Sequence, residues 1–314
     1  MDAIKKIFVF LVVISCIAIA GYEIYGLIEK KSAEADFSVT INDTLPYGQG
    51  KKARVVLLGG QSNASGCSRD EYLKKNVSEE QYEELKNGYD NVYINYYVSG
   101  NNKSNGFVKS GLIQGESGGF FGPELGMAQK LNELYPDEHF FIIKCAWGGT
   151  NLYEQWLSPS SRGKTGYLYN NFVKFVNESM EYLISKNYDV KIEGMCWMQG
   201  ESDAFLTSHA TEYKKLLTAF IKDIRKEFSQ YSADDGIAFA DAYISENWPY
   251  HELLNESKKG VANSSPLNTV VDTQAHGLTC SYEPEEAPDL AHYDSLSELK
   301  LGNLFIDSLA PFIN

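Results

Sequence analysis

Strand-like and helix-like segments alternate along most of this 314-residue chain, and this alternation is the feature that most restricts its fold. Strands are predicted at residues 53–58, 91–98, 139–144, 190–198 and 236–242, with a less regular sixth candidate at 269–272. Helices are predicted at residues 123–134, 167–185, 210–229 and 295–309, and in the second of them apolar side chains recur at helical spacing. Such alternation favours a parallel sheet covered by helices on both faces. We therefore expect an α/β domain of the three-layer, flavodoxin-like kind, with a parallel sheet of about five strands.

A glycine-rich turn with a serine follows the first predicted strand, and it reads Gly59-Gly60-Gln61-Ser62-Asn63. Glycine permits a tight turn there. The serine would then lie at the carboxyl edge of the sheet, where α/β folds bind ligands. Serine beside glycine also occurs in ordinary solvated turns. The segment is therefore a candidate nucleophile that needs support from elsewhere in the chain.

A serine nucleophile requires a general base, and His292 has the best context of the five histidines. Asp289 precedes it by three residues and can fold back within one turn to accept a hydrogen bond from the imidazole. His251 and His276 lie in predicted loops and stay open as alternatives. The other two histidines stand where a strand or a helix begins, which favours structural roles.

Two more glycine-containing turns follow predicted strands. One reads Trp147-Gly148-Gly149-Thr150, and the other reads Gln199-Gly200-Glu201-Ser202-Asp203. A backbone N–H in such a turn can point into a site, and a glutamine amide can supply another donor, as an oxyanion hole requires. Taken singly, each is also compatible with an ordinary turn between a strand and a helix.

Taken together and in this order, these stretches resemble the SGNH hydrolase superfamily. Within it, the nearest group is the sialate O-acetylesterase-like one, which includes carbohydrate esterase family six. The resemblance covers roughly residues 53–312 and includes a helix-opening segment at residues 122–126 (GPELG). Two positions depart from the pattern: Ala64, where methionine is common, and Leu290, where related versions have glycine. These departures concern the fit of the substrate and the shape of a loop more than the chemistry.

The resemblance implies a serine esterase that removes O-acetyl groups from carbohydrates, of the acetylxylan or sialic-acid type, through an acetyl-enzyme. Ser62 would be the nucleophile, His292 the general base and Asp289 the acid that orients it. No metal or organic cofactor is implied. Two alternatives stay open: a lipase-like or thioesterase-like SGNH hydrolase, and a non-catalytic carbohydrate-binding protein on the same scaffold.

The oxyanion hole implied by the resemblance consists of the backbone N–H groups of Ser62 and of Gly149 or Gly148, with the Gln199 side chain. Three further side chains are expected to position the substrate or these groups: Gln61, Asn63 and Glu201.

The N-terminal segment, residues 1–31, differs from the rest of the chain. Lys5 and Lys6 precede an apolar run from Ile7 to Tyr22, and residues 24–28 prolong it. This pattern predicts a membrane anchor or a signal sequence, since a spanning helix needs roughly 20 apolar residues. Residues 13–16 (VISC) resemble a lipoprotein cleavage box, so a cleaved lipoprotein is a further alternative. Residues 32–52 are read as a linker and lead-in, and residues 53–314 as the esterase domain, which we expect outside the cytoplasm.

The formal net charge of −14 and the lack of a basic patch argue against a nucleic-acid partner. The sequence leaves the oligomeric state open.

Four cysteines of the predicted domain are scattered without metal-type spacing, and an exported location would permit disulfides. They are read as buried free thiols, with a Cys67–Cys280 bridge as the alternative. Three segments have no assigned core role: a charged insert at 70–88, expected to be a surface helix, and long irregular regions at 99–122 and 243–268.

Overall fold

The computed structural model describes residues 37–232 and 236–313. The chain divides into two units, residues 1–38 and 39–314, and the helices and strands named below belong to the second. The predicted anchor or signal at residues 1–31 lies outside the described residues. Within the described ranges, no helix is both long enough and apolar enough to cross a membrane.

A central sheet organises this unit, with the order β10-β9-β8-β1-β7-β3-β4. Its parallel strands are β1 (Lys52–Gly60), β3 (Val92–Val98), β7 (Phe140–Ala146), β8 (Asp189–Met198), β9 (Ala238–Ala242) and β10 (Asn268–Val271). Two short strands, β4 (Asn102–Lys103) and β5 (Val108–Lys109), pair antiparallel with β3. All the predicted strands are therefore present, including the irregular sixth.

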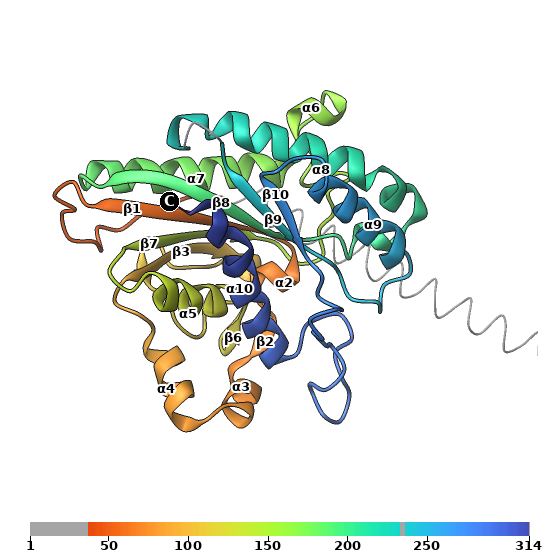
Figure 1. The fold of residues 1–314 in the computed structure, drawn as a ribbon, viewed down its shortest axis with the longest axis horizontal. Helices are drawn as coiled ribbons and strands as arrows, with labels where there is room; N and C mark the ends of the chain where they lie inside the picture. Colours follow the sequence, from red (N-terminus) through yellow and green to blue (C-terminus); the bar gives the residue numbers. More distant parts are fainter. Residues whose placement is uncertain (1–36, 233–235, 314) are drawn as a thin grey trace, which may run out of the picture. The chain divides into compact units, whose positions relative to one another are not determined.

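Helices cover both faces of the sheet, so the predicted three-layer α/β fold is confirmed (Figure 1). In Figure 1, α5 (Glu124–Leu134) and α10 (Ser295–Leu309) lie below the sheet, and α7 (Tyr167–Ser185) and α8 (Thr207–Glu227) lie above it. The central strands β1 and β7 are buried along almost their whole length, as a parallel sheet between two helical layers requires. On α7 the buried positions include Phe172, Val176 and Leu183, which recur at helical spacing and face the sheet.

Strand β1 lies between β7 and β8, and Gly60 pairs in register with Ala146 and Met198. The loops that follow these three strands therefore leave the same edge of the sheet side by side. Relative to β1, the strands β7 and β3 lie on one side in the sheet, and the later strands β8, β9 and β10 lie on the other. In open α/β sheets, ligands bind at such a point of reversal. The strand order differs in one respect from that of flavodoxin, where the first strand lies directly beside the second. In this chain β7 lies between β1 and β3, the first two parallel strands.

Helix α9 (His251–Ala262) lies within the region 243–268 that was expected to be irregular. The charged insert consists of two helices instead of one, α3 (Asp70–Asn76) and α4 (Glu79–Asn87). Shorter elements complete the unit: α2 (Ser62–Ser65), β2 (Ser68–Arg69), β6 (Phe120–Phe121), α6 (Pro159–Arg162), and 3-10 turns at Ser99–Asn101, Asp203–Phe205, Ser229–Tyr231 and Ala310–Phe312.

The cysteines Cys67, Cys145, Cys196 and Cys280 are all free thiols. The alternative of a Cys67–Cys280 bridge is therefore wrong, and the reading as free thiols is confirmed for these four. Burial raises the pKa of the Cys145 and Cys196 thiols, as expected for small apolar residues of a core.

Candidate active site

Ser62 lies where the sequence predicted, at the turn between β1 and the short helix α2. The turn is very close to the next strand, since a Cβ on Gly60 would come within 1.9 Å of the Met198 carbonyl oxygen. Only glycine fits there, and its φ of +140° also favours glycine. The side chain of Ser62 is thus held at the edge of the sheet, in a largely buried position.

His292 and Asp289 form the predicted pair. The imidazole Nδ1 lies 2.7 Å from Asp289 Oδ2, and the other carboxylate oxygen accepts the Ala291 N–H at 3.1 Å. The turn therefore fixes the carboxylate, and the carboxylate fixes the ring. With Nδ1 hydrogen bonded in this way, Nε2 is the ring nitrogen left for proton transfer.

Asn63 connects the serine turn to the histidine turn. Its Nδ2 donates to the Ala291 carbonyl at 3.3 Å, and its Oδ1 accepts the Tyr293 N–H at 3.1 Å. Ala291 and Tyr293 flank His292, and Asn63 follows Ser62. The turns that carry the residues predicted to act as nucleophile and base are therefore joined from positions 230 residues apart in the chain.

Glu201 also contacts this connection, because its Oε1 accepts a hydrogen bond from Asn63 Nδ2 at 2.7 Å. The NH₂ and the oxygen of the Asn63 amide both make hydrogen bonds within the protein. Its geometry therefore suits a role in holding the His292 turn more than the expected contact with substrate. Burial raises the pKa of Glu201. Glu201 thus supports Asn63, whereas one sequence-based expectation was that it would position Gln199.

The charges around His292 set its titration. Burial alone lowers its pKa, but the hydrogen bond and negative charge of Asp289, with the charges of Glu116 and Glu201, outweigh burial and raise it above the ordinary value. In return, the hydrogen bond to His292 lowers the pKa of Asp289. The pair therefore favours an ionised Asp289 and stabilises the imidazolium that forms when His292 accepts a proton.

The Gln199 amide is engaged in a buried network. Its Nε2 donates to Asp203 Oδ2 at 2.7 Å, to the Thr150 carbonyl at 3.0 Å and to Gln61 Oε1 at 3.2 Å, and its Oε1 accepts from the Tyr213 hydroxyl at 3.0 Å. An NH₂ group has only two hydrogens. In this arrangement Gln199 has no hydrogen left for an oxyanion, so its geometry departs from the predicted role.

Gln61, which directly precedes Ser62, is oriented by the same network. Its Oε1 accepts hydrogen bonds from the Gln199 amide and from the backbone N–H groups of Gly200 and Ser202, at 3.2–3.3 Å. With its oxygen held by these donors, the Gln61 NH₂ points away from them and makes no hydrogen bond within residues 37–232 and 236–313. Gln61 therefore presents an amide donor beside the nucleophile.

The glycine turn after β7 supplies the other backbone donor. The Gly148 N–H donates to Ser99 Oγ at 2.7 Å, so this group is already used. The Gly149 N–H makes no hydrogen bond among the residues that the structure describes. Of the two glycines predicted for the oxyanion hole, Gly149 is the one whose donor stays available.

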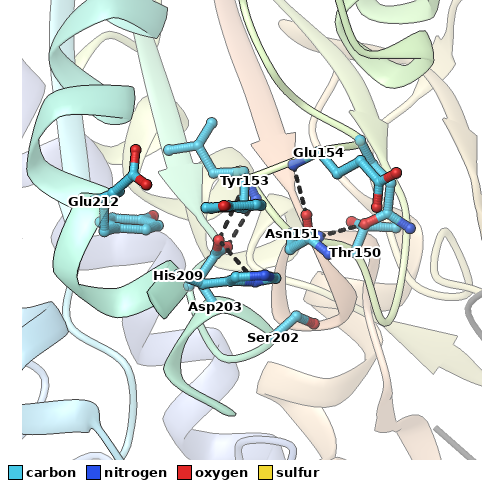
Figure 2. Close-up of polar contacts among 12 residues, drawn as sticks. Thr150, Asn151, Tyr153, Glu154, Ser202, Asp203, His209 and Glu212 are labelled. Carbon is cyan, nitrogen blue, oxygen red and sulfur yellow. Dashed lines mark hydrogen bonds and ion pairs between the residues drawn. The ribbon is translucent and has the colours of Figure 1, made fainter. Parts of the chain in front are cut away.

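Asp203 ties the loops after β7 and β8 together, and Figure 2 shows it below the backbone of the 150–154 loop. Its carboxylate accepts the N–H groups of Leu152 at 2.7 Å and of Tyr153 at 3.1 Å. Burial raises the pKa of Asp203 to about 6, against these hydrogen bonds. The Tyr153 ring stacks on His209, with centroids 3.9 Å apart, so His209 is packed at the edge of this loop.

The two alternative histidines have other surroundings. His251 begins α9, and its Nδ1 lies 2.8 Å from the Trp248 carbonyl oxygen. His276 is exposed in the turn after β10. His292 is the histidine whose turn is bound to the residue next to Ser62, which favours it as the base.

The chain is similar in sequence to known carbohydrate esterases. The sequence profile described as "Carbohydrate esterase, sialic acid-specific acetylesterase" matches residues 52–310. A curated relative, the probable 9-O-acetyl-N-acetylneuraminic acid deacetylase of Escherichia coli (strain K12), is 27% identical over 192 residues, which are 54% of this chain and 57% of the relative. The chain thus spans little more than half the length of that relative.

Solved structures share the fold. A protein from Arabidopsis thaliana matches with a TM-score of 0.60 and 19% identity, covering 82% of this chain and 98% of its own. NanS matches with a TM-score of 0.60 and 17% identity, covering 84% and 98%. A carbohydrate acetylesterase from Xanthomonas citri matches with a TM-score of 0.56 and 16% identity, covering 82% and 56%. These likenesses support the three-layer arrangement that the alternating sequence pattern predicted.

Proposed function

The chain belongs to the carbohydrate esterase family described as sialic acid-specific acetylesterase, and from this premise we propose that it is a serine esterase that removes O-acetyl groups from carbohydrates. The observation that carries the proposal is the Asn63 connection. Its side chain binds the backbone on both sides of His292, while the His292 ring is held by Asp289. A serine, a histidine and a carboxylate in this relation are what acyl transfer requires.

In the proposed first step, His292 Nε2 accepts the proton of the Ser62 hydroxyl while Ser62 Oγ attacks the acetyl carbonyl carbon. Asp289 remains ionised and stabilises the imidazolium. The tetrahedral intermediate then breaks its bond to the sugar oxygen, and His292 returns the proton to that oxygen. The products of this step are the free sugar hydroxyl and an acetyl ester on Ser62.

We propose that the oxyanion is held by the backbone N–H groups of Ser62 and Gly149 and by the Gln61 amide. Gln61 takes the place of the predicted Gln199, because the Gln199 NH₂ is shared among acceptors of the protein. Gln199 then acts indirectly, by donating to Gln61 Oε1 and leaving the Gln61 NH₂ as the donor to the oxyanion. Preorganised donors of this kind supply a large part of catalysis in acyl transfer.

Water completes the cycle by the same route. His292 accepts a proton from a water molecule whose oxygen attacks the acetyl carbon, and it returns the proton to Ser62 Oγ as acetate leaves. Each turnover thus consumes one water and releases one acetate. Acetate release is therefore the quantity to measure.

The proposed substrates are acetylated glycans, and both acetylxylan and acetylated sialic acids belong in the first screen. The curated relative is named for a sialic-acid deacetylase, and the Xanthomonas citri protein for carbohydrate acetylesterase activity. Acetate release from a panel of acetylated glycans tests the proposal, with butyrate and octanoate esters beside it. Preference for the longer acyl chains would point to a lipase-like enzyme, and no turnover of any ester would reject the esterase proposal.

A further inference from the structure

The long loop between β3 and α5 brings one more carboxylate, Glu116, next to the candidate active site. The Glu116 N–H donates to the Gly66 carbonyl at 2.9 Å, and Gly66 is the residue that ends α2, the helix of Ser62. The neighbouring Gly115 carbonyl accepts a hydrogen bond from Asn102 Nδ2 at 2.6 Å. The backbone of Glu116 is therefore fixed against the serine turn.

The side chain of Glu116 extends from there to the glycine turn after β7. Its Oε1 is so close to Gly148 that a Cβ on that glycine would lie 2.6 Å away. Gly148 precedes Gly149, whose N–H we assign to the oxyanion hole. The carboxylate thus lies between the end of the serine helix and the oxyanion turn.

One oxygen of the Glu116 carboxylate is left without a hydrogen bond among the described residues, although the Cys67 thiol is hydrogen bonded to this side chain. Its Oε1 is buried and has no hydrogen-bond partner within the described ranges, whereas the residue as a whole is only partly buried. A buried carboxylate oxygen that accepts no hydrogen bond is poorly stabilised. A hydroxyl group donated to its accessible side would stabilise it, and a bound sugar carries such groups.

His292 lies within reach of the same charge, because Glu116 is one of the carboxylates that raise the pKa of His292, after burial and the Asp289 bond. The other charged groups that act on His292 are Asp289 and Glu201. Asp289 is bonded to His292 and Glu201 is bonded to Asn63. Of these three carboxylates, Glu116 is the one bonded neither to His292 nor to Asn63. We therefore assign it to the alcohol part of the ester, whose oxygen receives the proton from His292.

We propose that Glu116 determines specificity by accepting a hydrogen bond from a free hydroxyl on the carbon adjacent to the one that bears the acetyl ester. The preferred substrates are then partly acetylated sugars and polyols with a free neighbouring hydroxyl, as opposed to fully substituted ones. This inference rests on the proposed esterase function, because the neighbouring hydroxyl belongs to the alcohol that His292 protonates.

The test compares 2-hydroxyethyl acetate with 2-methoxyethyl acetate. The two esters have the same acyl group, and only the first can donate a hydrogen bond from the neighbouring oxygen. p-Nitrophenyl acetate, which has no such hydroxyl, serves as the activity control. Rates are measured on the high-pH plateau, where a change in the pKa of His292 has no influence, and are divided by the uncatalysed rates.

We expect wild-type kcat/KM for the hydroxy ester to exceed that for the methoxy ester by about tenfold or more, the range of a hydrogen bond to a charged acceptor. In Glu116→Gln this ratio should fall several-fold, and p-nitrophenyl acetate turnover measures any general loss of activity separately from the ratio. Glu80→Gln, an exposed position on α4, should keep the wild-type ratio. The same contrast should appear between a methyl xyloside with one acetyl group and its analogue with the remaining hydroxyls methylated.

A ratio close to one in the wild type, or a ratio that Glu116→Gln leaves unchanged in a folded protein, would overturn the proposed role of Glu116 even if all three esters are hydrolysed. Failure of the wild type to turn over any acetyl ester, p-nitrophenyl acetate included, would instead reject the esterase function itself. Melting temperatures of the variants, compared with that of the wild type, identify a loss of folding.

Discussion

The His292–Asp289 pair is the residue-scale feature with the clearest consequence for activity. Asp289 lowers the energy of the imidazolium, so the pKa of His292 lies above the ordinary histidine value of about 6.5. Because the base has to be neutral before it accepts the serine proton, activity should rise with pH through that raised pKa. The protein should therefore lose kcat/KM on the acid side at a higher pH than an isolated histidine would imply.

Replacing Asp289 by Asn tests this relation. The change removes the negative charge and leaves one acceptor oxygen where two now accept, from His292 Nδ1 and from the Ala291 N–H. We expect kcat to fall, by up to about 10⁴-fold as the tautomer is lost, and the acid limb of the kcat/KM profile to move to lower pH. Asp137→Asn, at an exposed position, is the matched control. An acid limb that stays in place in Asp289→Asn would argue against His292 as the titrating base.

Single residues also show where sequence reasoning succeeds and where it does not. Asp289 and His292 could be paired from the sequence, because their spacing of three brings them together within one turn. The roles of Gln61 and Gln199 could not be separated, because both are glutamines at strand ends. Their roles depend on which neighbours accept their amide hydrogens. For Gln199 these include Asp203 in its own turn and the Thr150 carbonyl on another loop.

At the scale of elements, Asp203 links the two loops that frame the oxyanion site. Replacing it by Ala leaves the Leu152 and Tyr153 N–H groups without an acceptor and removes the shortest of the hydrogen bonds of the Gln199 amide. We expect the free energy of unfolding to fall by about 3 kcal/mol, as measured by urea denaturation. Asp203→Asn retains an acceptor oxygen and should lose less. Equal stability of Asp203→Ala and the wild type would mean that these hydrogen bonds do not hold the loops.

Helix α7, which was predicted correctly, and helix α9, which was missed, differ in the residues of their buried faces. Helix α7 has an apolar stripe, and its bounds were predicted as observed. Helix α9 was missed because its buried face includes Lys258, a residue type that is ordinarily exposed. Lys258 is buried here because its Nζ binds Asp241 Oδ1 at 2.6 Å. That partner comes from β9, so the sequence of α9 alone could not reveal it.

At the scale of the whole molecule, the alternation of elements was enough to predict the layers, but not the strand order or the shape of the loops. The irregular region 99–122 was noted only for its length, yet it supplies Ser99 and Glu116 to the site. Loops of this kind have no periodic pattern. Glu116 is held by the hydrogen bond of its N–H to the Gly66 carbonyl, and the Ser99 side chain accepts one from the Gly148 N–H. Both glycines lie in other parts of the chain.

The N-terminal segment leads to a prediction about location. We propose that residues 1–31 anchor the protein, with its esterase domain outside the cytoplasm, because residues 7–28 are long and apolar enough to enter a bilayer. The full chain should sediment with membranes, and its domain should be open to protease on intact cells. A chain that lacks residues 1–31 should be soluble and keep its kcat/KM. Recovery of the full chain entirely from the cytosol would contradict the anchor and the orientation.

The central claim is that Ser62 carries the acetyl group, and covalent labelling tests it most directly. The protein is treated with an organophosphonate that reacts with activated serines, and the labelled peptide is identified by mass spectrometry. We predict one adduct per chain, on Ser62, formed in step with the loss of acetate release and absent from Ser62→Ala and His292→Ala. An adduct on another serine such as Ser202, or full activity in a folded Ser62→Ala protein, would contradict the account.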